Sequence, residues 1–307
     1  MQNTLLVILG PTGVGKSALA IDLAKQFHGE IVSADSRQIY KYMNIGTAKP
    51  STTELSTTPH HIIDIINPDE IYSLAFFLHD AVNAIKTIHK QGKIPILVGG
   101  TGQWLWALIE GWNVPEIPPN QELRLRLTEQ SKENGYMSLR AELSKLNPSA
   151  ASKIDARNVR RVIRALELCY SDIDIQQAHQ KQQASPYKTL IFGLTMDRSA
   201  LYGKIDNRVD KMIESGWINE VGNLLDMGFH RELPSLSSLG YQEIIQYLSG
   251  EISQEYAVTQ IKNRTHKFAR NQNTWFKQTD QRIKWLDPKS AFRSIDTELT
   301  RWIKNPN

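Results

Sequence analysis

The sequence predicts an α/β fold, in which a parallel sheet is covered by helices and the chain is interrupted by an inserted helical domain. Two patterns support this prediction. In the N-terminal third, short continuous apolar runs alternate with helical stripes, as in a parallel sheet with helices on its faces. Farther along, a charged stretch of helical pattern precedes a further strand at Thr189–Thr195. The simplest division is a core of residues 1–112 and 188–307, with a helical insertion at 113–187.

Three apolar runs are expected to be buried parallel strands, namely Thr4–Leu9, Glu30–Ala34 and Ile94–Val98. Gly10-Pro11 bounds the first, Asp35 follows the second, and two glycines follow the third. The intervening helices carry apolar residues at helical spacing. One starts at Lys16 and stops at Gly29, and the other is capped by Ser73 and stops at Gly92.

The middle of the chain has a different composition. Asn113–Asn120 is rich in proline and is interpreted as a linker, and the sequence from Gln121 to Tyr170 is helical in pattern. The glutamine-rich stretch Ile175–Pro186 is expected to be a loop. After the strand at Thr189–Thr195, helices are expected up to the C-terminus.

Composition limits the class of protein. The chain has 307 residues, of which 40% are hydrophobic and 22% charged, as in ordinary soluble domains rather than disordered chains or coiled-coil rods. The apolar run Leu5–Leu9 is too short for a membrane span, so no membrane association is expected. A single cysteine, Cys169, fits a reducing compartment such as the cytoplasm. The net charge of +4 permits a polyanionic partner without requiring one.

A phosphate-binding loop is the strongest motif. The segment Gly10-Pro11-Thr12-Gly13-Val14-Gly15-Lys16-Ser17 matches G-x-x-x-x-G-K-[ST] and stands between a predicted strand and a predicted helix. Glycines let backbone amides turn toward a phosphate, and the helix N-terminus adds its positive dipole end. Lys16 would reach the terminal phosphate, and the Ser17 hydroxyl would ligate Mg²⁺. The fold is therefore expected to be P-loop NTPase-like.

The motif leaves the ligand open. A nucleoside triphosphate such as ATP is the usual occupant, but a hydrolysing NTPase normally supplies a metal-binding aspartate after an apolar strand. Ile94–Val98 ends in glycines instead, whereas Asp35 ends the strand that follows the first helix. In small-molecule kinases the residue at this position commonly contacts the acceptor substrate. Asp35 therefore favours group transfer to a second substrate over hydrolysis.

The carboxyl ends of the predicted strands define a candidate active site. Ligands of open α/β sheets lie outside these ends, so Asp35 and Thr101 should face the same crevice as Lys16. A carboxylate there can orient or deprotonate an acceptor. The competing interpretations are a turn cap for Asp35 and a helix N-cap for Thr101. The pair His60-His61 lacks further ligands at metal-binding spacing and is expected to be structural.

A basic stripe is expected in the helical insertion. Arg157, Arg160, Arg161 and Arg164 fall on one helix face, while the other face carries apolar residues that include Val162 and Ile163. Only Asp155 and Glu167 are nearby acids, so the stripe is either an anion-binding face or a solvated one. A second segment combines cations and flat rings, which suits nucleic acid or the packing of a terminal helix. It comprises Lys262, Arg264, His266, Lys267, Arg270, Trp275, Phe276 and Lys277.

Together these motifs resemble the tRNA dimethylallyltransferase family, also called tRNA isopentenyltransferase, over nearly the whole chain. Besides the phosphate loop, the matching segments are Asp35–Tyr40, Gly46–Pro50, His60–Asp64, Gly99–Gly102, Arg161–Glu167, Gly240–Glu243 and Gln272 with Thr274–Phe276. The resemblance implies a P-loop core with a helical insertion. It also implies transfer of a dimethylallyl group from dimethylallyl diphosphate to the exocyclic amine of the adenine 3′ to a tRNA anticodon.

The resemblance implies roles for individual residues. The phosphate loop, with Thr12 to Ser17 foremost, would bind the diphosphate with Mg²⁺, and Arg208 would also reach it. Asp35 would be the base, with Thr101 beside it. The tRNA contacts would come from Asp35, Ser36, Arg37, Gln38, Thr101, Arg124, Arg160, Arg161, Val162, Ile163 and Arg164. A cytoplasmic monomer that binds the anticodon stem-loop is expected.

The chain departs from the family pattern at Val14, Gln103, Trp104, Arg160, Lys204 and Asn271. These changes bear on fine specificity at the tRNA contact and the prenyl pocket. Two other functions remain alternatives. A small-molecule kinase would need ATP, and a non-catalytic RNA-binding P-loop protein would bind tRNA without modifying it.

Overall fold

The computed structural model describes residues 3–304 except 116, 118 and 172–184. The chain divides into two compact units, one formed by residues 1–111 and 184–307 and the other by residues 112–183. The expected glutamine-rich loop, Ile175–Pro186, lies outside the described residues up to position 184. Across the described part of the chain, no helix combines the length and apolar character needed to cross a membrane.

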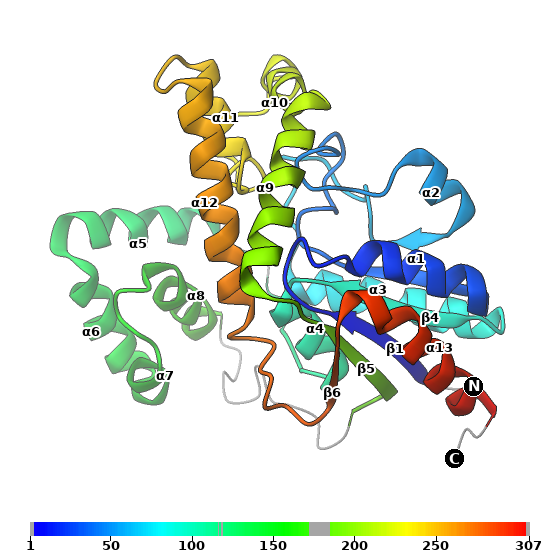
Figure 1. The fold of residues 1–307 in the computed structure, drawn as a ribbon. Coiled ribbons are helices and arrows are strands. Elements are labelled where there is room, and N and C mark those ends of the chain that lie inside the picture. Colours follow the sequence, from blue (N-terminus) through cyan, green and yellow to red (C-terminus); the bar gives the residue numbers. More distant parts are fainter. Residues whose placement is uncertain (1–2, 116, 118, 172–184, 305–307) are drawn as a thin grey trace. The chain divides into compact units, whose positions relative to one another are not determined.

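The first unit is built on a parallel sheet with the order β3-β2-β4-β1-β5-β6 (Figure 1). Its strands are β1 (Thr4–Leu9), β2 (Gly29–Ala34), β3 (His60–His61), β4 (Ile94–Gly99), β5 (Lys188–Leu194) and β6 (Ile283–Leu286). All pairs of neighbouring strands are parallel, which confirms the predicted fold class. The central strands are buried along their whole length because helices cover both faces, so their sequences read as continuous apolar runs.

Helices form layers on the two faces of this sheet. Packing on one face involves α1 (Lys16–Phe27) and α13 (Pro288–Lys304), which share a core with inward residues of the strands, such as Ile8 and Phe192. On the other face lie α3 (Leu74–Lys90) and α4 (Gly102–Ile109). Ser73 caps α3 by accepting from the amide of Phe76, as its sequence indicates. A short helix, α2 (Thr52–Thr57), precedes β3.

The rest of the first unit is helical except for one strand. The helices are α9 (Arg198–Glu214), α10 (Trp217–Asp226), α11 (Tyr241–Leu248) and α12 (Gln254–Gln272), and α9 packs along α12. The expectation of helices alone after Thr195 is wrong at Ile283–Leu286. This segment is β6, an edge strand that pairs with β5, and its four residues are too few to show a period in the sequence.

The second unit consists of helices in its described part. They are α5 (Gln121–Asn134), α6 (Tyr136–Leu146), α7 (Pro148–Lys153) and α8 (Val159–Tyr170), which confirms the helical pattern predicted for this stretch. Their core includes Leu127, Leu139 and Leu143, together with the apolar face of α8. Each helix is short, so burial of these apolar faces rather than intrinsic propensity holds the unit together.

Candidate active site

The register of the sheet brings three chain segments to one edge. Leu9 at the end of β1 pairs with Gly99 at the end of β4, and Gly99 also pairs with Ala34 at the end of β2. The chain therefore leaves the sheet at one level in all three strands. The segments that follow the three strands are the phosphate loop, the Asp35 turn and the Thr101 loop. These segments therefore surround the crevice that is expected outside the strand ends.

The phosphate loop closes onto the start of α1. Gly15 precedes the helix with a φ of 111°, a left-handed conformation that a residue with a Cβ adopts only under strain. The Lys16 ammonium donates a hydrogen bond to the carbonyl of Pro11 at 2.8 Å and thereby holds the loop curled. The amides at the start of α1 lack partners within the helix, so the loop forms an anion-binding concavity.

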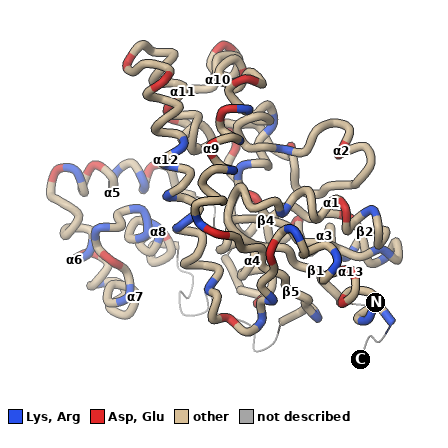
Figure 2. Tube along the Cα trace, viewed as in Figure 1, with Lys and Arg blue, Asp and Glu red and all other residues tan. Residues whose placement is uncertain are grey.

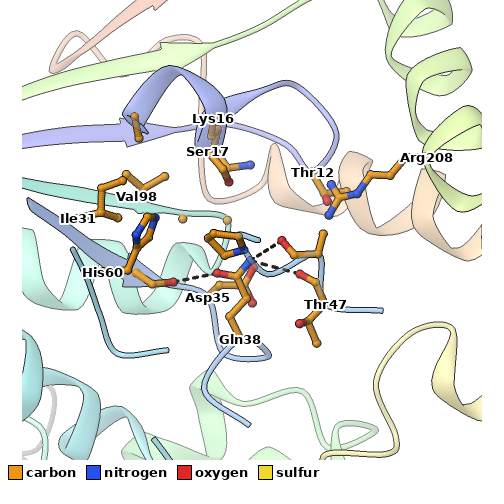
Figure 3. A pocket seen from close by; sticks show the side chains of 16 residues that line it. Thr12, Lys16, Ser17, Ile31, Asp35, Gln38, Thr47, His60, Val98 and Arg208 are labelled. Carbon is orange, nitrogen blue, oxygen red and sulfur yellow. Dashed lines mark hydrogen bonds between the residues drawn. The ribbon is translucent and has the colours of Figure 1, made fainter. Parts of the chain in front are cut away.

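A pocket of about 70 Å³ lies between this loop and the ends of β2 and β4. Figure 3 shows Thr12 and Arg208 on one side of it and Ile31, Val98 and His60 grouped on the other. Lys16, Ser17 and Asp35 also line it. The pocket thus has a cationic side and an apolar side, with a carboxylate between them.

The electrostatics of the pocket indicate an anionic ligand. Burial lowers the pKa of Lys16 from 10.5 to about 8, although the negative charge of Asp35 opposes the shift and the nearby Arg208 adds to it. Burial also lowers the pKa of Arg208, again against the pull of Asp35. Two cations therefore share a single carboxylate inside the pocket. A bound diphosphate would supply the missing negative charge.

Asp35 also shapes its own turn. One of its carboxylate oxygens accepts a hydrogen bond from the amide of Arg37 at 2.9 Å, which is the turn-capping geometry weighed as the alternative role. The capping interaction and a position in the pocket therefore occur together. Thr101 stands at the N-cap position directly before α4, but its side chain does not cap the helix. Its hydroxyl instead accepts from the amide of Ser36 at 3.1 Å, beside Asp35, and it is not among the residues that line the pocket.

Two further residues of the Asp35 turn are held by the protein itself. The Gln38 amide nitrogen donates to the carbonyls of Thr47 and Ala48, at 3.2 and 3.1 Å, and its oxygen accepts from Ser33. Both amide hydrogens of Gln38 are therefore used within the protein. The Arg37 guanidinium donates to the carbonyl of Pro234 at 2.9 Å.

Sequence reasoning assigned no role in this site to Glu220, which it did not name, or to Gln272, which it named only within a matching segment. Glu220 accepts from the amides of Asn44, Ile45 and Gly46 and from the Tyr241 hydroxyl, and thereby fixes the loop that leads to Thr47. Gln272 contacts the phosphate loop itself. All these contacts join residues far apart in the chain, so no local sequence pattern predicts them.

The histidine pair divides between two environments. His61 bonds the buried Glu30 carboxylate at 2.7 Å, which fits the structural role expected for it. His60 bonds the carbonyl of Thr58 at 2.7 Å and also lines the pocket. Burial lowers the pKa of His60, so the neutral ring is favoured on the apolar side.

The arginines of the helical unit play unequal roles. Glu167 on α8 is buried and accepts from Arg124 at 2.7 and 2.8 Å and from Arg164 at 3.1 Å. Burial alone would raise the pKa of Glu167, but hydrogen bonds from these two arginines outweigh it and lower the pKa. Arg157 pairs with Asp155. Arg124 and Arg164, both expected to contact tRNA, are thus engaged in holding the unit together.

The remaining residues of the expected tRNA-binding run point in two directions. Val162 and Ile163 pack in the core of the helical unit with 1% and 7% of their surface exposed, so a side-chain contact from either to tRNA is excluded in this conformation. Arg160 and Arg161 are exposed, and neither has an ion-pair partner among the described residues. Figure 2 shows basic residues recurring along α8. Arg160 and Arg161 form the part of the stripe that is open to an anionic partner.

The second basic segment is largely engaged with its own unit. Lys262 pairs with Asp210, Arg264 with Glu243 and His266 with Asp206, while Phe276 is buried. Arg270 donates to the Tyr202 hydroxyl. Lys267, Lys277 and Trp275 remain exposed on this segment.

The departures from the family pattern also differ in environment. Val14 is buried beneath the phosphate loop, and Trp104 stacks on Phe77 with ring centroids 4.4 Å apart. The other four, Gln103, Arg160, Lys204 and Asn271, are exposed. Lys204 lines a groove of about 740 Å³ that shares Arg208 with the pocket. The buried departures therefore affect packing, Val14 at the phosphate loop and Trp104 between α4 and α3, and the exposed ones affect surfaces.

Comparison with known proteins identifies the family. The IPP transferase family model matches residues 38–279, and the isopentenyl transferase model matches residues 3–69. A curated tRNA dimethylallyltransferase from Carboxydothermus hydrogenoformans is 47% identical over 303 residues, covering 97% of each chain. One from Thermomicrobium roseum is 45% identical over 286 residues, covering 93% of this chain and 87% of its own.

Solved structures that resemble this chain point to the same family. The full-length tRNA isopentenylpyrophosphate transferase from Bacillus halodurans matches with a TM-score of 0.73 and 37% identity, covering 99% of this chain and 97% of that one. A eukaryotic dimethylallyltransferase acting on tRNA matches with a TM-score of 0.81 and 28% identity, covering 98% of this chain and 80% of that one. With family, sequence and fold in agreement along nearly its whole length, the chain belongs to the IPP transferase family.

Proposed function

We propose that the protein transfers a dimethylallyl group from dimethylallyl diphosphate to the exocyclic N6 amine of the adenine 3′-adjacent to the anticodon in tRNA, releasing diphosphate. One observation carries the proposal. A phosphate loop, two cations that share one carboxylate, and an apolar wall meet in a single pocket of a chain from this family. Its relatives are named for this reaction.

The two sides of the pocket match the two parts of the donor. The loop amides, Lys16 and Arg208 would hold the diphosphate, and Ile31 and Val98 would lie against the five-carbon tail. An apolar wall of this kind favours a prenyl tail over the ribose of a nucleoside triphosphate. We therefore propose dimethylallyl diphosphate, not ATP, as the occupant of the loop.

The residues of the pocket fit a magnesium ion that is shared with the substrate. The described residues contain no group of three or more acidic, histidine or cysteine side chains that could hold a metal by themselves. Ser17 on the loop is exposed and offers one hydroxyl oxygen. Mg²⁺ typically takes few protein ligands and completes its shell with water and substrate phosphate oxygens. When bound, Mg²⁺ would neutralise negative charge on the departing diphosphate.

The leaving group sets the main chemical demand. An adenine amine is a weak nucleophile because its lone pair is delocalised into the ring, so the allylic C–O bond must break easily. Its electron pair leaves with the diphosphate, where Lys16, Arg208 and the loop amides stabilise the developing charge. Fixed donors of this kind are commonly the largest contribution to catalysis.

The acceptor side depends on Asp35. As the new C–N bond forms, the amine nitrogen becomes positive, and Asp35 would take its proton. The Ser36–Thr101 hydrogen bond keeps the Asp35 turn against the β4–α4 loop. The target base must leave its stack to enter such a pocket, and in an anticodon loop it is already single-stranded, which lowers the cost.

We also infer the setting of the reaction. We propose that the protein acts as a monomer. The tRNA substrate and the single cysteine are consistent with a cytoplasmic protein. Arg160 and Arg161 are the exposed cations of α8 that we propose for the tRNA backbone.

Incubation with Mg²⁺, total tRNA and radiolabelled dimethylallyl diphosphate tests the proposal. Label should appear in tRNA and, after nuclease digestion, in a modified adenosine, without added ATP. A small-molecule kinase would require ATP and ignore the prenyl donor. A non-catalytic binder would shift tRNA in a gel without labelling it. Either of these outcomes would refute the proposed activity.

A further inference from the structure

A buried glutamine joins the far C-terminal part of the first unit to the phosphate loop. Gln272 ends α12 with 4% of its surface exposed. Its side-chain oxygen accepts from the amide of Thr12 at 2.8 Å, and its side-chain nitrogen donates to the carbonyl of Gly100 at 2.9 Å. One amide group therefore spans the gap between the phosphate loop and the loop that carries Thr101.

The fit around Gln272 is close. A Cβ added to Gly100 would lie 2.4 Å from the Gln272 side-chain nitrogen and 3.8 Å from the Lys16 ammonium. No side chain fits at Gly100 without displacing Gln272. The backbone at Gly100 therefore lies near both the Gln272 amide and the Lys16 ammonium, which lines the pocket.

The chain just after Gln272 is anchored at a second point. The Trp106 indole on α4 donates to the carbonyl of Trp275 at 2.9 Å, and the Trp275 side chain packs against Gly102. Phe276 is buried with 1% exposed. Gln272 therefore cannot swing away independently of its surroundings.

The helix that carries Gln272 is also tied to the helix that carries Arg208. Lys262 on α12 pairs with Asp210 on α9 at 2.7 Å, and His266 stacks on Tyr202 with ring centroids 4.0 Å apart. Thus α12 supports both the phosphate loop and the helix that presents the second pocket cation.

We propose that Gln272 is a positioning residue for the phosphate loop. By holding the Thr12 amide and the Gly100 carbonyl together, it sets the spacing between the diphosphate-binding amides and the Asp35–Thr101 side of the pocket. Only a side chain with a donor and an acceptor at this separation satisfies both partners. The role rests on the proposed function for its chemistry, but its effect on diphosphate binding can be measured without any transfer reaction.

Three variants test the role, each with inorganic diphosphate and Mg²⁺ as the probe in calorimetry. Gln272→Met keeps the length and removes both hydrogen bonds, Gln272→Asn shortens the reach, and Gln272→Glu removes the donor and adds a charge near Lys16. Gln278→Met, at an exposed position, is the control. We expect Gln272→Met to weaken diphosphate binding by about tenfold, since one buried polar contact at each end of the bridge is lost. The control should bind like the wild type.

The pH dependence of binding separates positioning from a general loss of stability. In Gln272→Glu the new carboxylate should raise the pKa of Lys16. The affinity for diphosphate should then begin to decline at a higher pH than in the wild type. If all three variants only lower the melting temperature, and keep wild-type affinity and pH profile well below it, Gln272 is structural and the proposal is wrong. If the wild type binds diphosphate but transfers no prenyl group, the proposed function fails while the Gln272 proposal still stands on its binding measurement.

Discussion

The phosphate-loop pocket and the arginine face of α8 are both cationic in sequence, yet the structure uses their charges differently. In the pocket, Lys16 and Arg208 share the single carboxylate of Asp35. On α8, the buried Glu167 occupies Arg164 together with Arg124 from α5. Cations inside a cavity that outnumber the acids there indicate an anionic ligand. On a helix face, only those cations that have no ion pair within the protein indicate such a ligand.

The largest expected effect comes from removing the pocket carboxylate. Asp35→Asn keeps an oxygen that can accept from the Arg37 amide, so the turn should survive while the base is lost. The single-turnover rate of prenyl transfer should fall by at least about a hundredfold, the lower end for a general base, with tRNA binding retained. Asp69→Asn, at an exposed carboxylate, serves as the control. A near-normal rate for Asp35→Asn would eliminate Asp35 as the base.

On α8 the second largest effect should fall on stability. Arg164→Ala leaves the buried Glu167 with fewer donors, so the free energy of unfolding in urea should drop by about 1–3 kcal/mol, the usual cost of an under-satisfied buried polar group. Adding Glu167→Gln should recover part of the loss because the buried charge is then gone. Arg161→Ala, at an exposed arginine, should change stability little. Equal stabilities for Arg164→Ala and Arg161→Ala would show that Arg164 is merely a surface charge.

These two regions also show what the sequence could predict. The phosphate loop and Asp35 were accessible because each follows a strand directly, and the parallel register of β1, β2 and β4 carries those ends to one edge. The helical pattern of the insertion and the buried face of α8 were accessible for a similar reason, since a local period encodes them.

What the sequence could not predict depends on contacts between distant residues. Gln272 and Thr12 are separated by 260 positions, and Arg124 and Glu167 by 43. No local spacing reveals such pairs, so the contact between Arg124 and Glu167 could not be predicted. Glu167 lies only three residues after Arg164, and the sequence marks it as a nearby acid. The tRNA contacts expected of Arg124 and Arg164 stay predictions. The strand β6 was missed because pairing with β5, not its own four residues, makes it a strand.

A smaller effect concerns the pH dependence of donor binding. Dimethylallyl diphosphate is fully ionised above pH 8, so titration of Lys16 dominates there. Because the pKa of Lys16 is about 8 in the free protein and a bound diphosphate favours the charged form, binding takes up a proton above that pH. Affinity measured by calorimetry should fall about tenfold per pH unit above pH 8. In Lys16→Met this slope should vanish, and a slope that persists would assign the titration to another group.

The same lowered pKa has the opposite effect on stability. Below pH 8, Lys16 is charged in the folded and unfolded chains, so folding carries the full cost of burying the charge. Between about 8 and 10.5 the folded chain has lost the proton that the unfolded chain keeps, so this contribution to stability rises with pH. Donor affinity and the Lys16 contribution to stability should therefore move in opposite directions across this window.

The smallest effect should come from the exposed part of the α8 face. Replacing Arg160 and Arg161 together by alanine should weaken tRNA binding several-fold and leave the affinity for dimethylallyl diphosphate unchanged. Each lost phosphate contact should also flatten the dependence of log affinity on log salt by about 0.7, the value for single-stranded nucleic acid. Alanine has high helix propensity and neither arginine has an ion-pair partner among the described residues, so the melting temperature should barely move.

The double variant Lys289→Ala/Arg293→Ala, on exposed positions of α13, is the control, because it removes the same charge elsewhere. If both double variants shift the salt slope equally, the effect is one of net charge. If Arg160→Ala/Arg161→Ala keeps the wild-type affinity for tRNA and the wild-type salt slope, this face of α8 is simply solvated. Unlike the cations of the pocket, the exposed arginines of α8 would then not bind the substrate.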